Sequence, residues 1–109
     1  MKKYKVEFLP SAWREIDEIS NYYLNKVGQK SAKKIFDRIF KAIQRLEIFP
    51  LSCPLINDEM LRQEGYRILI CDDYICVYKL VDEVVYIYHI ANGRTNYKNL
   101  IQKNKPIIQ

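Results

Sequence analysis

This sequence lacks the short motifs from which the chemistry of many small enzymes can be inferred. Its three glycines form no glycine-rich phosphate loop, and it contains a single histidine, His89. Its three cysteines, Cys53, Cys71 and Cys76, do not have C-x-x-C spacing, so the sequence predicts neither a disulfide framework nor a zinc site. We therefore expect no metal and no organic cofactor.

Long hydrophobic runs are also lacking, and none approaches the length that crosses a membrane. The opening residues Met1-Lys2-Lys3-Tyr4-Lys5 lead into charged, strand-like sequence rather than into the apolar core of a secretion signal. These observations predict a cytoplasmic protein with reduced thiols and no membrane contact. The length of 109 residues leaves room for one modest core, so residues 1–109 are expected to form a single domain.

The formal charge of +5 is distributed unevenly along the chain. Residues 1–56 carry eleven Lys or Arg and six Asp or Glu, residues 57–93 carry three and seven, and residues 94–109 carry four and none. This balance favours an acidic partner, either nucleic acid or an acidic protein segment. Ordinary solubilising lysines on an exposed surface are the alternative explanation.

The hydrophobic pattern of the first half predicts a strand and two helices. Residues 5–9 are strand-like, Pro10 stops the strand, and Ser11 is a suitable N-cap for a helix. Apolar residues then recur at helical spacing until Gly28, which is expected to end that helix: Ala12, Ile16, Ile19 and Tyr23. The second helix ends shortly before Pro50 and has an apolar stripe opposite a basic face: Ala32, Ile35, Ile39, Ala42, Ile43 and Leu46.

The second half of the chain is predicted to contain most of a sheet. Residues 51–63 have no clear period and are expected to form a loop. Strands are predicted at 66–71, 74–80 and 84–90, joined by tight turns at Asp72-Asp73 and Asp82-Glu83. A short helix at about 95–103 completes the order β-α-α-β-β-β-α. We therefore predict an α+β fold in which a helical hairpin packs on a mostly antiparallel twisted sheet.

The order and spacing of these segments resemble the RelE/ParE toxins of bacterial type II toxin–antitoxin pairs, over about residues 4–101. The resemblance rests on five segments: the strand ending at Pro10, the helix pair closed by Ile48-Phe49-Pro50, Tyr66-Arg67-Ile68-Leu69, the strand from Tyr74 to Tyr78, and the final Arg94, Tyr97 and Leu100-Ile101. It implies a small toxin held inactive by a cognate antitoxin protein that covers its surface. A homodimer and a toxin–antitoxin heterotetramer both stay open as assemblies.

The resemblance implies one of two activities, which differ in their target. RelE-like members are mRNA interferases, metal-independent endoribonucleases that cut messenger RNA in the ribosome, whereas ParE-like members inhibit growth by poisoning DNA gyrase. The long helices followed by Phe49-Pro50 are similar to the ParE-like branch. By this matching, Ile75 stands where RelE-like nucleases carry an arginine, and Leu69 stands where they carry a lysine. The favoured reading is therefore a gyrase inhibitor, with the ribosome-dependent mRNA endonuclease as the alternative.

The matched positions supply the candidate site. The candidate binding residues are Arg94, Tyr97, Lys98 and Arg67. An arginine can hold a phosphate through two parallel hydrogen bonds, and a tyrosine can stack on a base or donate a proton. In the nuclease alternative, the catalytic set is Arg94, Tyr97, Arg67 and His89.

Each of these residues also has a structural explanation. Arg94 could pair with a carboxylate at the end of the last strand, and Tyr97 could pack the final helix on the sheet. Arg67 could form an internal ion pair or lie on a solvated face. His89 alternates with Val85 and Ile87, as a partly buried structural histidine would.

Overall fold

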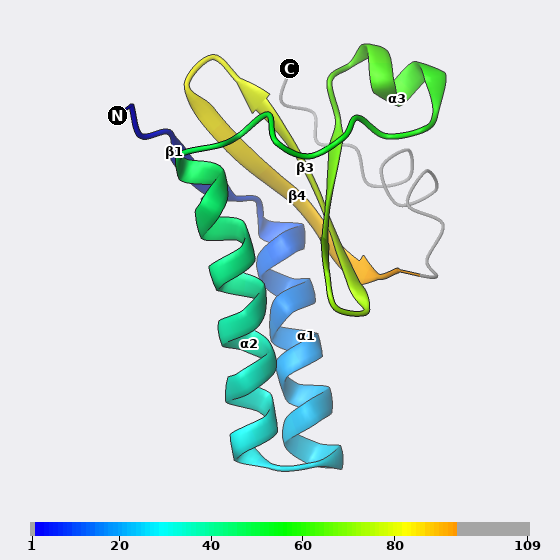
Figure 1. Cartoon of the computed structure of the whole chain (residues 1–109). Coiled ribbons are helices and arrows are strands. Elements are labelled where there is room, and N and C mark those ends of the chain that lie inside the picture. Colours follow the sequence, from blue (N-terminus) through cyan, green and yellow to red (C-terminus); the bar gives the residue numbers. More distant parts are fainter. Residues whose placement is uncertain (1, 94–109) are drawn as a thin grey trace.

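The computed structural model describes residues 2–93. In chain order its elements are β1 (Lys5–Phe8), α1 (Pro10–Lys26), α2 (Gln29–Gln44), the 3-10 turn η1 (Arg45–Glu47), α3 (Glu59–Gln63), β2 (Arg67–Cys71), β3 (Tyr74–Val81) and β4 (Val84–Asn92). The strands form one sheet in the order β1-β4-β3-β2, where β1 is parallel to β4 and the other neighbours are antiparallel (Figure 1). The predicted α+β fold is confirmed. The helix predicted at about 95–103 lies outside the described residues.

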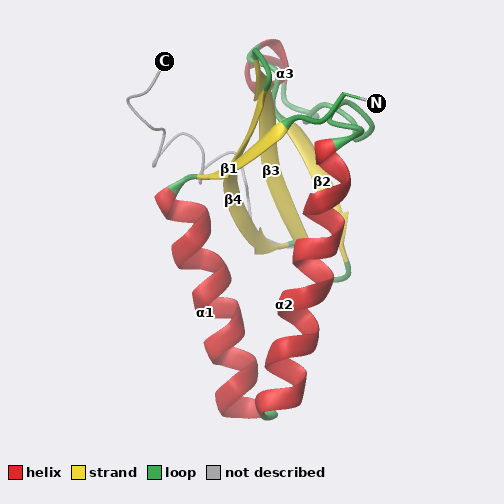
Figure 2. Ribbon diagram, turned by 90° about the vertical axis from the view of Figure 1, so that its left-hand side faces the viewer, coloured by secondary structure: helices red, strands yellow, loops and turns green. Residues whose placement is uncertain are grey.

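The two long helices form the predicted hairpin. Gly28 joins them with φ +140°, a conformation that favours glycine, and the amides of Val27 and Gly28 both donate to the carbonyl oxygen of Tyr23. The buried positions lie in the first half of α1 and in the middle and second half of α2: Ala12, Ile16, Ile35, Ile39, Ala42 and Ile43. The base of the hairpin therefore packs on the sheet, while its tip projects beyond the strands (Figures 1 and 2).

Two local predictions were wrong. Helix α1 begins at Pro10 rather than after Ser11, because proline already has the φ angle of a first helical residue and needs no amide hydrogen there. The segment 51–63 is not all loop, since α3 occupies its end. The carboxylate of Asp58 caps α3 by accepting the amide of Leu61, and the side chain of Leu61 is buried. A five-residue helix is too short to produce a detectable apolar period.

The strands and turns of the second half agree with the prediction to within two residues at each end. Asp72 and Asp82 have φ angles of 54° and 56°, in the left-handed region that aspartate tolerates better than most residues. Both predicted tight turns are thus present, and they connect β2 to β3 and β3 to β4.

Strand β3 is buried on both faces of the sheet. The hairpin covers one face, where Cys76 and Tyr78 join the main core. A second core lies on the opposite face: Ile56, Leu61, Tyr66, Ile75, Val77 and Tyr88. The four consecutive residues 75–78 are therefore all buried. In a strand with one face exposed to solvent, buried and exposed residues would alternate instead.

Side chains of α1 replace a strand along part of the β4 edge. Strand β1 pairs with β4 only as far as Ile87. Beyond that point, the Ser11 hydroxyl donates to the Tyr88 carbonyl oxygen at 2.7 Å, and the Ile90 amide donates to Oε1 of Glu15 at 2.9 Å. These contacts hold α1 beside the end of β4, where a register shift opposite Val77 and Tyr78 bends the strand.

Removing these edge contacts should destabilise the fold. In Glu15→Gln, an NH2 group replaces one carboxylate oxygen and faces a hydrogen-bond donor, so we expect the free energy of unfolding to fall by about 1–3 kcal/mol. Ser11→Ala should lower it by about 1 kcal/mol. Asp17→Asn, an exposed change on the same helix, should alter it by less than about 0.5 kcal/mol. Urea denaturation measures all three. Equal stabilities of the Glu15 and Asp17 variants would contradict this account.

Alkaline conditions should also destabilise the fold. Burial raises the pKa of Tyr66 and of Tyr78 above the ordinary value of 10. The unfolded chain therefore releases these protons first as the pH rises, so stability is present below pH 10 and is lost above it. When phenolate absorbance and unfolding are followed together, Tyr66 and Tyr78 should ionise above pH 10, as the protein unfolds. Tyr66→Phe should reduce the pH dependence. Ionisation of all tyrosines near pH 10 in the folded protein would refute the prediction.

Candidate functional site

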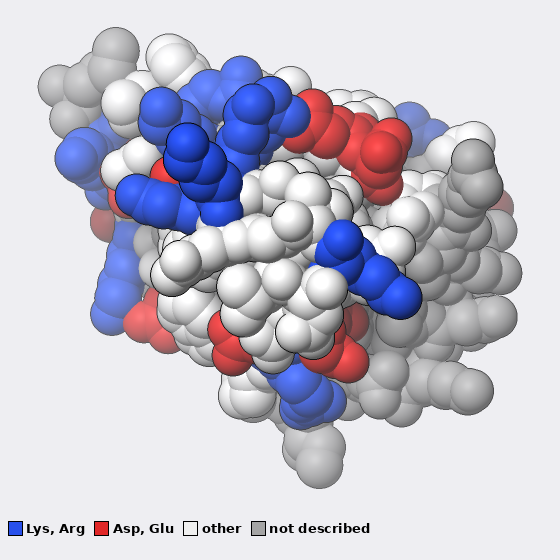
Figure 3. All heavy atoms as spheres, turned by 90° about the horizontal axis from the view of Figure 1, so that it is seen from below, with Lys and Arg blue, Asp and Glu red and all other residues white. Residues whose placement is uncertain are grey.

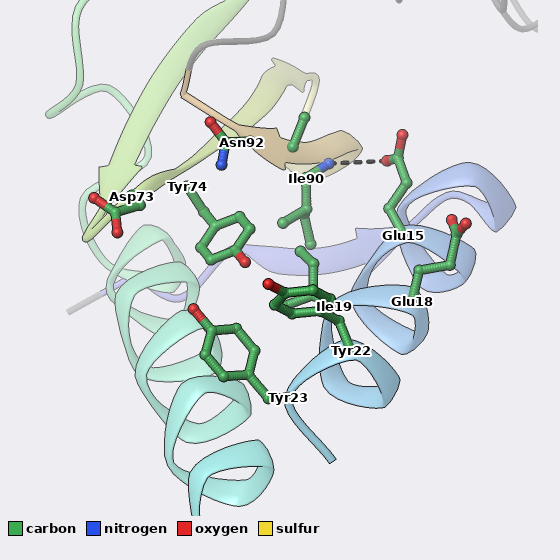
Figure 4. Close-up of a pocket in the computed structure, with 10 residues that line it drawn as sticks. Glu15, Glu18, Ile19, Tyr22, Tyr23, Asp73, Tyr74, Ile90 and Asn92 are labelled. Carbon is green, nitrogen blue, oxygen red and sulfur yellow. Dashed lines mark hydrogen bonds between the residues drawn. The ribbon is translucent and has the colours of Figure 1, made fainter. Parts of the chain in front are cut away.

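A cleft of about 550 Å³ lies where α1 extends past the ends of β3 and β4 (Figure 4). Its lining combines carboxylates, tyrosines and an apolar floor: Glu15, Glu18, Ile19, Tyr22, Tyr23, Asp73, Tyr74, Ile90, Ala91 and Asn92. The cleft exists because the hairpin packs on the sheet only at its base. We refer to this site as the tyrosine cleft.

Three tyrosines from two elements form its centre. Tyr22 and Tyr23 are neighbours on α1 with their rings edge to face at 5.5 Å, and Tyr74 reaches them from β3 (Figure 4). Burial and a hydrogen bond with Tyr23 raise the pKa of Tyr74 to about 12. The Tyr74 hydroxyl is therefore neutral at physiological pH and can both donate and accept a hydrogen bond.

The three carboxylates of the cleft differ in their contacts. Glu15 is occupied, since its Oε2 lies 3.0 Å from Nδ1 of His89 and its Oε1 accepts the Ile90 amide. A carboxylate only accepts, so Nδ1 of His89 carries the hydrogen. Glu18 and Asp73 are exposed, and among residues 2–93 neither side chain has an ion-pair partner.

A second cleft lies on the other side of the Tyr23–Tyr74 contact. It is lined by residues of α2 and the β2–β3 turn, including Lys34, Arg38 and Asp72. The guanidinium of Arg38 is held by the carboxylate of Asp72 at 3.3 Å. Tyr23, Asp73 and Tyr74 line both clefts and form the boundary between an acidic hollow and one that carries both signs of charge.

The basic residues of α2 are exposed, as the sequence predicts. They are Lys30, Lys33, Lys34, Arg38 and Lys41, followed by Arg45 in η1. Seen from the tip of the hairpin, Lys and Arg side chains gather on one side of the molecule (Figure 3). None of these basic residues lines the tyrosine cleft, whose described lining contains neither lysine nor arginine.

Arg67 is engaged inside the fold. Its Nη1 donates to the carbonyl oxygens of Cys53, at 2.6 Å, and Leu51, at 3.5 Å. Its cross-strand partner Tyr78 donates to the Pro50 carbonyl oxygen at 2.8 Å. Together the two side chains hold the segment 50–53 against the sheet.

The positions of this chain at which RelE-like nucleases carry basic residues do not all lie on one face of the sheet. Leu69 belongs to the core under the hairpin, and Arg67, two residues away on β2, lies on that same face. Ile75 belongs to the core on the opposite face. The three positions therefore point to two different sides.

His89 is 2% exposed and contacts Glu15, so it is more deeply buried than the sequence suggests. The register shift in β4 also interrupts its simple alternation with Val85 and Ile87. Strand β3 separates it from Arg67 on β2. The structure does not bring these two candidates together, and Arg94, Tyr97 and Lys98 lie outside the described residues.

Sequence reasoning missed the tyrosine cleft. The adjacent Tyr22 and Tyr23 are a usable signal, because only one of two neighbouring helical residues can point fully into a core. The approach of Tyr74 has no local signal, since it depends on how the hairpin crosses the sheet. In the described part of the chain, His, Cys, Asp and Glu side chains form no group of three that could hold a metal. Nor is any helix within residues 2–93 long and apolar enough to cross a membrane.

Comparisons with known proteins assign the family. The sequence model described as the ParE toxin of the type II toxin–antitoxin system parDE matches residues 6–97. A search of curated proteins gave no match.

Solved structures with this fold include those of three toxin–antitoxin systems. The chromosomal ParDE system from P. aeruginosa matches with a TM-score of 0.70 and 16% identity, covering 83% of this chain and 96% of that one. The RelBE2 complex from Mycobacterium tuberculosis matches with a TM-score of 0.57 and 19% identity, covering 83% of this chain and 98% of that one. The E. coli DinJ–YafQ complex matches with a TM-score of 0.55 and 13% identity, covering 84% of this chain and 93% of that one. These likenesses concern the fold, whereas the sequence match covers most of the chain, and by that match the chain belongs to the ParE toxin family of type II toxin–antitoxin systems.

Proposed function

We propose that this toxin inhibits growth by binding DNA gyrase, without catalysing a reaction itself, and that a cognate antitoxin protein neutralises it. The observation that carries the choice of target is the engagement of Arg67 and His89 in contacts within the fold. A cytoplasmic location follows from this proposal, because bacterial gyrase acts on DNA there.

Cleavage of RNA through its 2′-hydroxyl requires a base, an acid and cations around a single phosphate. Arg67 directs its guanidinium to loop carbonyls, and His89 is buried against Glu15 with β3 between the two residues. Neither is positioned to reach a phosphate shared with the other. The nuclease alternative would have to rely on Arg94, Tyr97 and Lys98.

We assign the gyrase contact to the basic segment that follows β4. Arg94, Tyr97 and Lys98 come directly after the end of that strand, and residues 94–109 carry four basic and no acidic residues. Such a segment suits an acidic surface on the target.

The proposal of an antitoxin partner is supported by the similar structures, which come from toxin–antitoxin systems. The similar structures are those of the ParDE system and of the RelBE2 and DinJ–YafQ toxin–antitoxin complexes. We extend such a pairing to this chain.

Parallel assays distinguish the two targets. Purified toxin should trap cleaved plasmid in the presence of gyrase and ATP, and it should leave messenger RNA intact on translating ribosomes. Arg94→Glu should abolish the gyrase effect because it reverses the charge of the proposed contact. Lys33→Glu, the same charge change on an exposed site of α2, should retain most of it. Codon-phased cuts in messenger RNA, with no trapped plasmid, would establish the nuclease instead.

Arg67 should behave as a structural residue. Arg67→Met leaves the carbonyl groups of Leu51 and Cys53 without their donor, so we expect the free energy of unfolding to fall by about 1–3 kcal/mol, measured by urea denaturation. Gyrase trapping per folded molecule should stay unchanged. Arg14→Met, an exposed change on α1, is the control and should affect neither. Loss of activity in the Arg67 variant at unchanged stability would contradict the assignment.

A further inference from the structure

The gyrase proposal makes no use of the tyrosine cleft. We propose that this cleft binds an arginine side chain presented by a segment of the antitoxin. The chemistry of the site rests on the cleft alone, and only the identity of the protein that carries the arginine rests on the proposed function.

The shape and lining of the cleft fit a guanidinium group. Its volume of about 550 Å³ lies within the range of about 300–1,000 Å³ that is typical of small-molecule sites. A planar guanidinium stacks on aromatic faces, and Tyr22, Tyr23 and Tyr74 supply three rings around one hollow (Figure 4). The apolar floor formed by Ile19, Ile90 and Ala91 can cover the methylene stem of the arginine.

The charges of the cleft are complementary to a cation. Figure 4 shows Glu18 and Asp73 on opposite sides of the tyrosine rings. Both carboxylates lack an ion-pair partner among the described residues, whereas the neighbouring Asp72 already holds Arg38. A guanidinium lying on the tyrosines would be located between these two negative charges, and its several N–H donors could reach the tyrosine hydroxyls.

The same arrangement disfavours other ligands. A phosphate or an acidic peptide would meet Glu18 and Asp73, which repel it. A lysine ammonium would gain the charge contact but not the planar stacking. Lys34 and Arg38 line the adjoining cleft, which shares Asp73 with this one, and Arg38 is paired there with Asp72.

The first test uses a small probe on the intact protein. Amide shifts in the NMR spectrum of labelled toxin should follow the addition of N-acetyl-arginine amide and concentrate on residues 18–23 and 90–92, with a dissociation constant on the order of millimolar. N-acetyl-citrulline amide has the same shape without the charge and should bind at least about tenfold more weakly. Equal binding of the two probes, or no shifts at about 50 mM arginine amide, would overturn the proposal.

Matched double variants locate the site. Glu18→Gln combined with Asp73→Asn should weaken arginine-amide binding by about tenfold, because it removes both unpaired charges. Asp17→Asn combined with Asp82→Asn makes the same change in charge, on the same helix and in the other tight turn, and should leave binding unchanged. Retained affinity in the cleft variant would place the probe elsewhere.

The antitoxin is tested separately. The cleft variant should raise the dissociation constant of the toxin–antitoxin complex by about tenfold or more, while the control variant should not. Arginine-amide binding with an unchanged antitoxin affinity would overturn the assignment of the partner. Gyrase trapping by the cleft variant should persist, so failure of this inference and failure of the proposed target give different results.

Discussion

Glu15 links the two halves of the molecule through hydrogen bonds to the end of β4. One carboxylate accepts the amide of Ile90 and the ring hydrogen of His89 at the point where β1 no longer covers the strand edge. Without a partner, these buried polar groups would lose their hydrogen bonds to water and gain none in return. The contact fixes the position of α1 beside β4, and the place of the tyrosine cleft follows from it.

The hairpin and the sheet meet only at the base of the hairpin. Ala12 and Ile16 are small or slender enough for α1 to lie close to β4, whereas Tyr22 and Tyr23 farther along the helix extend past the strands. Tyr22 and Tyr23 therefore lie at the margin of the sheet, where Tyr23 and Tyr74 also pack against the main core. One packing constraint accounts for both the main core and the hollow beside it.

The candidate residues that lie in the described part of the chain make contacts within the fold. Arg67 donates to carbonyl oxygens of the segment between η1 and α3 and so holds that segment in place. His89 completes the contact of Glu15 with β4. A buried polar group such as His89 needs a partner of this kind, and Arg67, which is partly buried, has two carbonyl partners as well. A positive charge or an imidazole in the sequence is thus a weak guide to a site until its neighbours are seen.

The sequence alone determined the order of the elements, the hairpin and the tight turns, because helical spacing, strand-like runs and Gly28 are local signals. It also determined the family, since the order and spacing of segments survive at low identity. Only the tertiary structure decided which face Arg67 occupies, how deeply His89 is buried, and that Tyr74 meets Tyr23. These depend on strand register and on the crossing of α1 over β4, and contacts between distant residues leave no periodic trace in the chain.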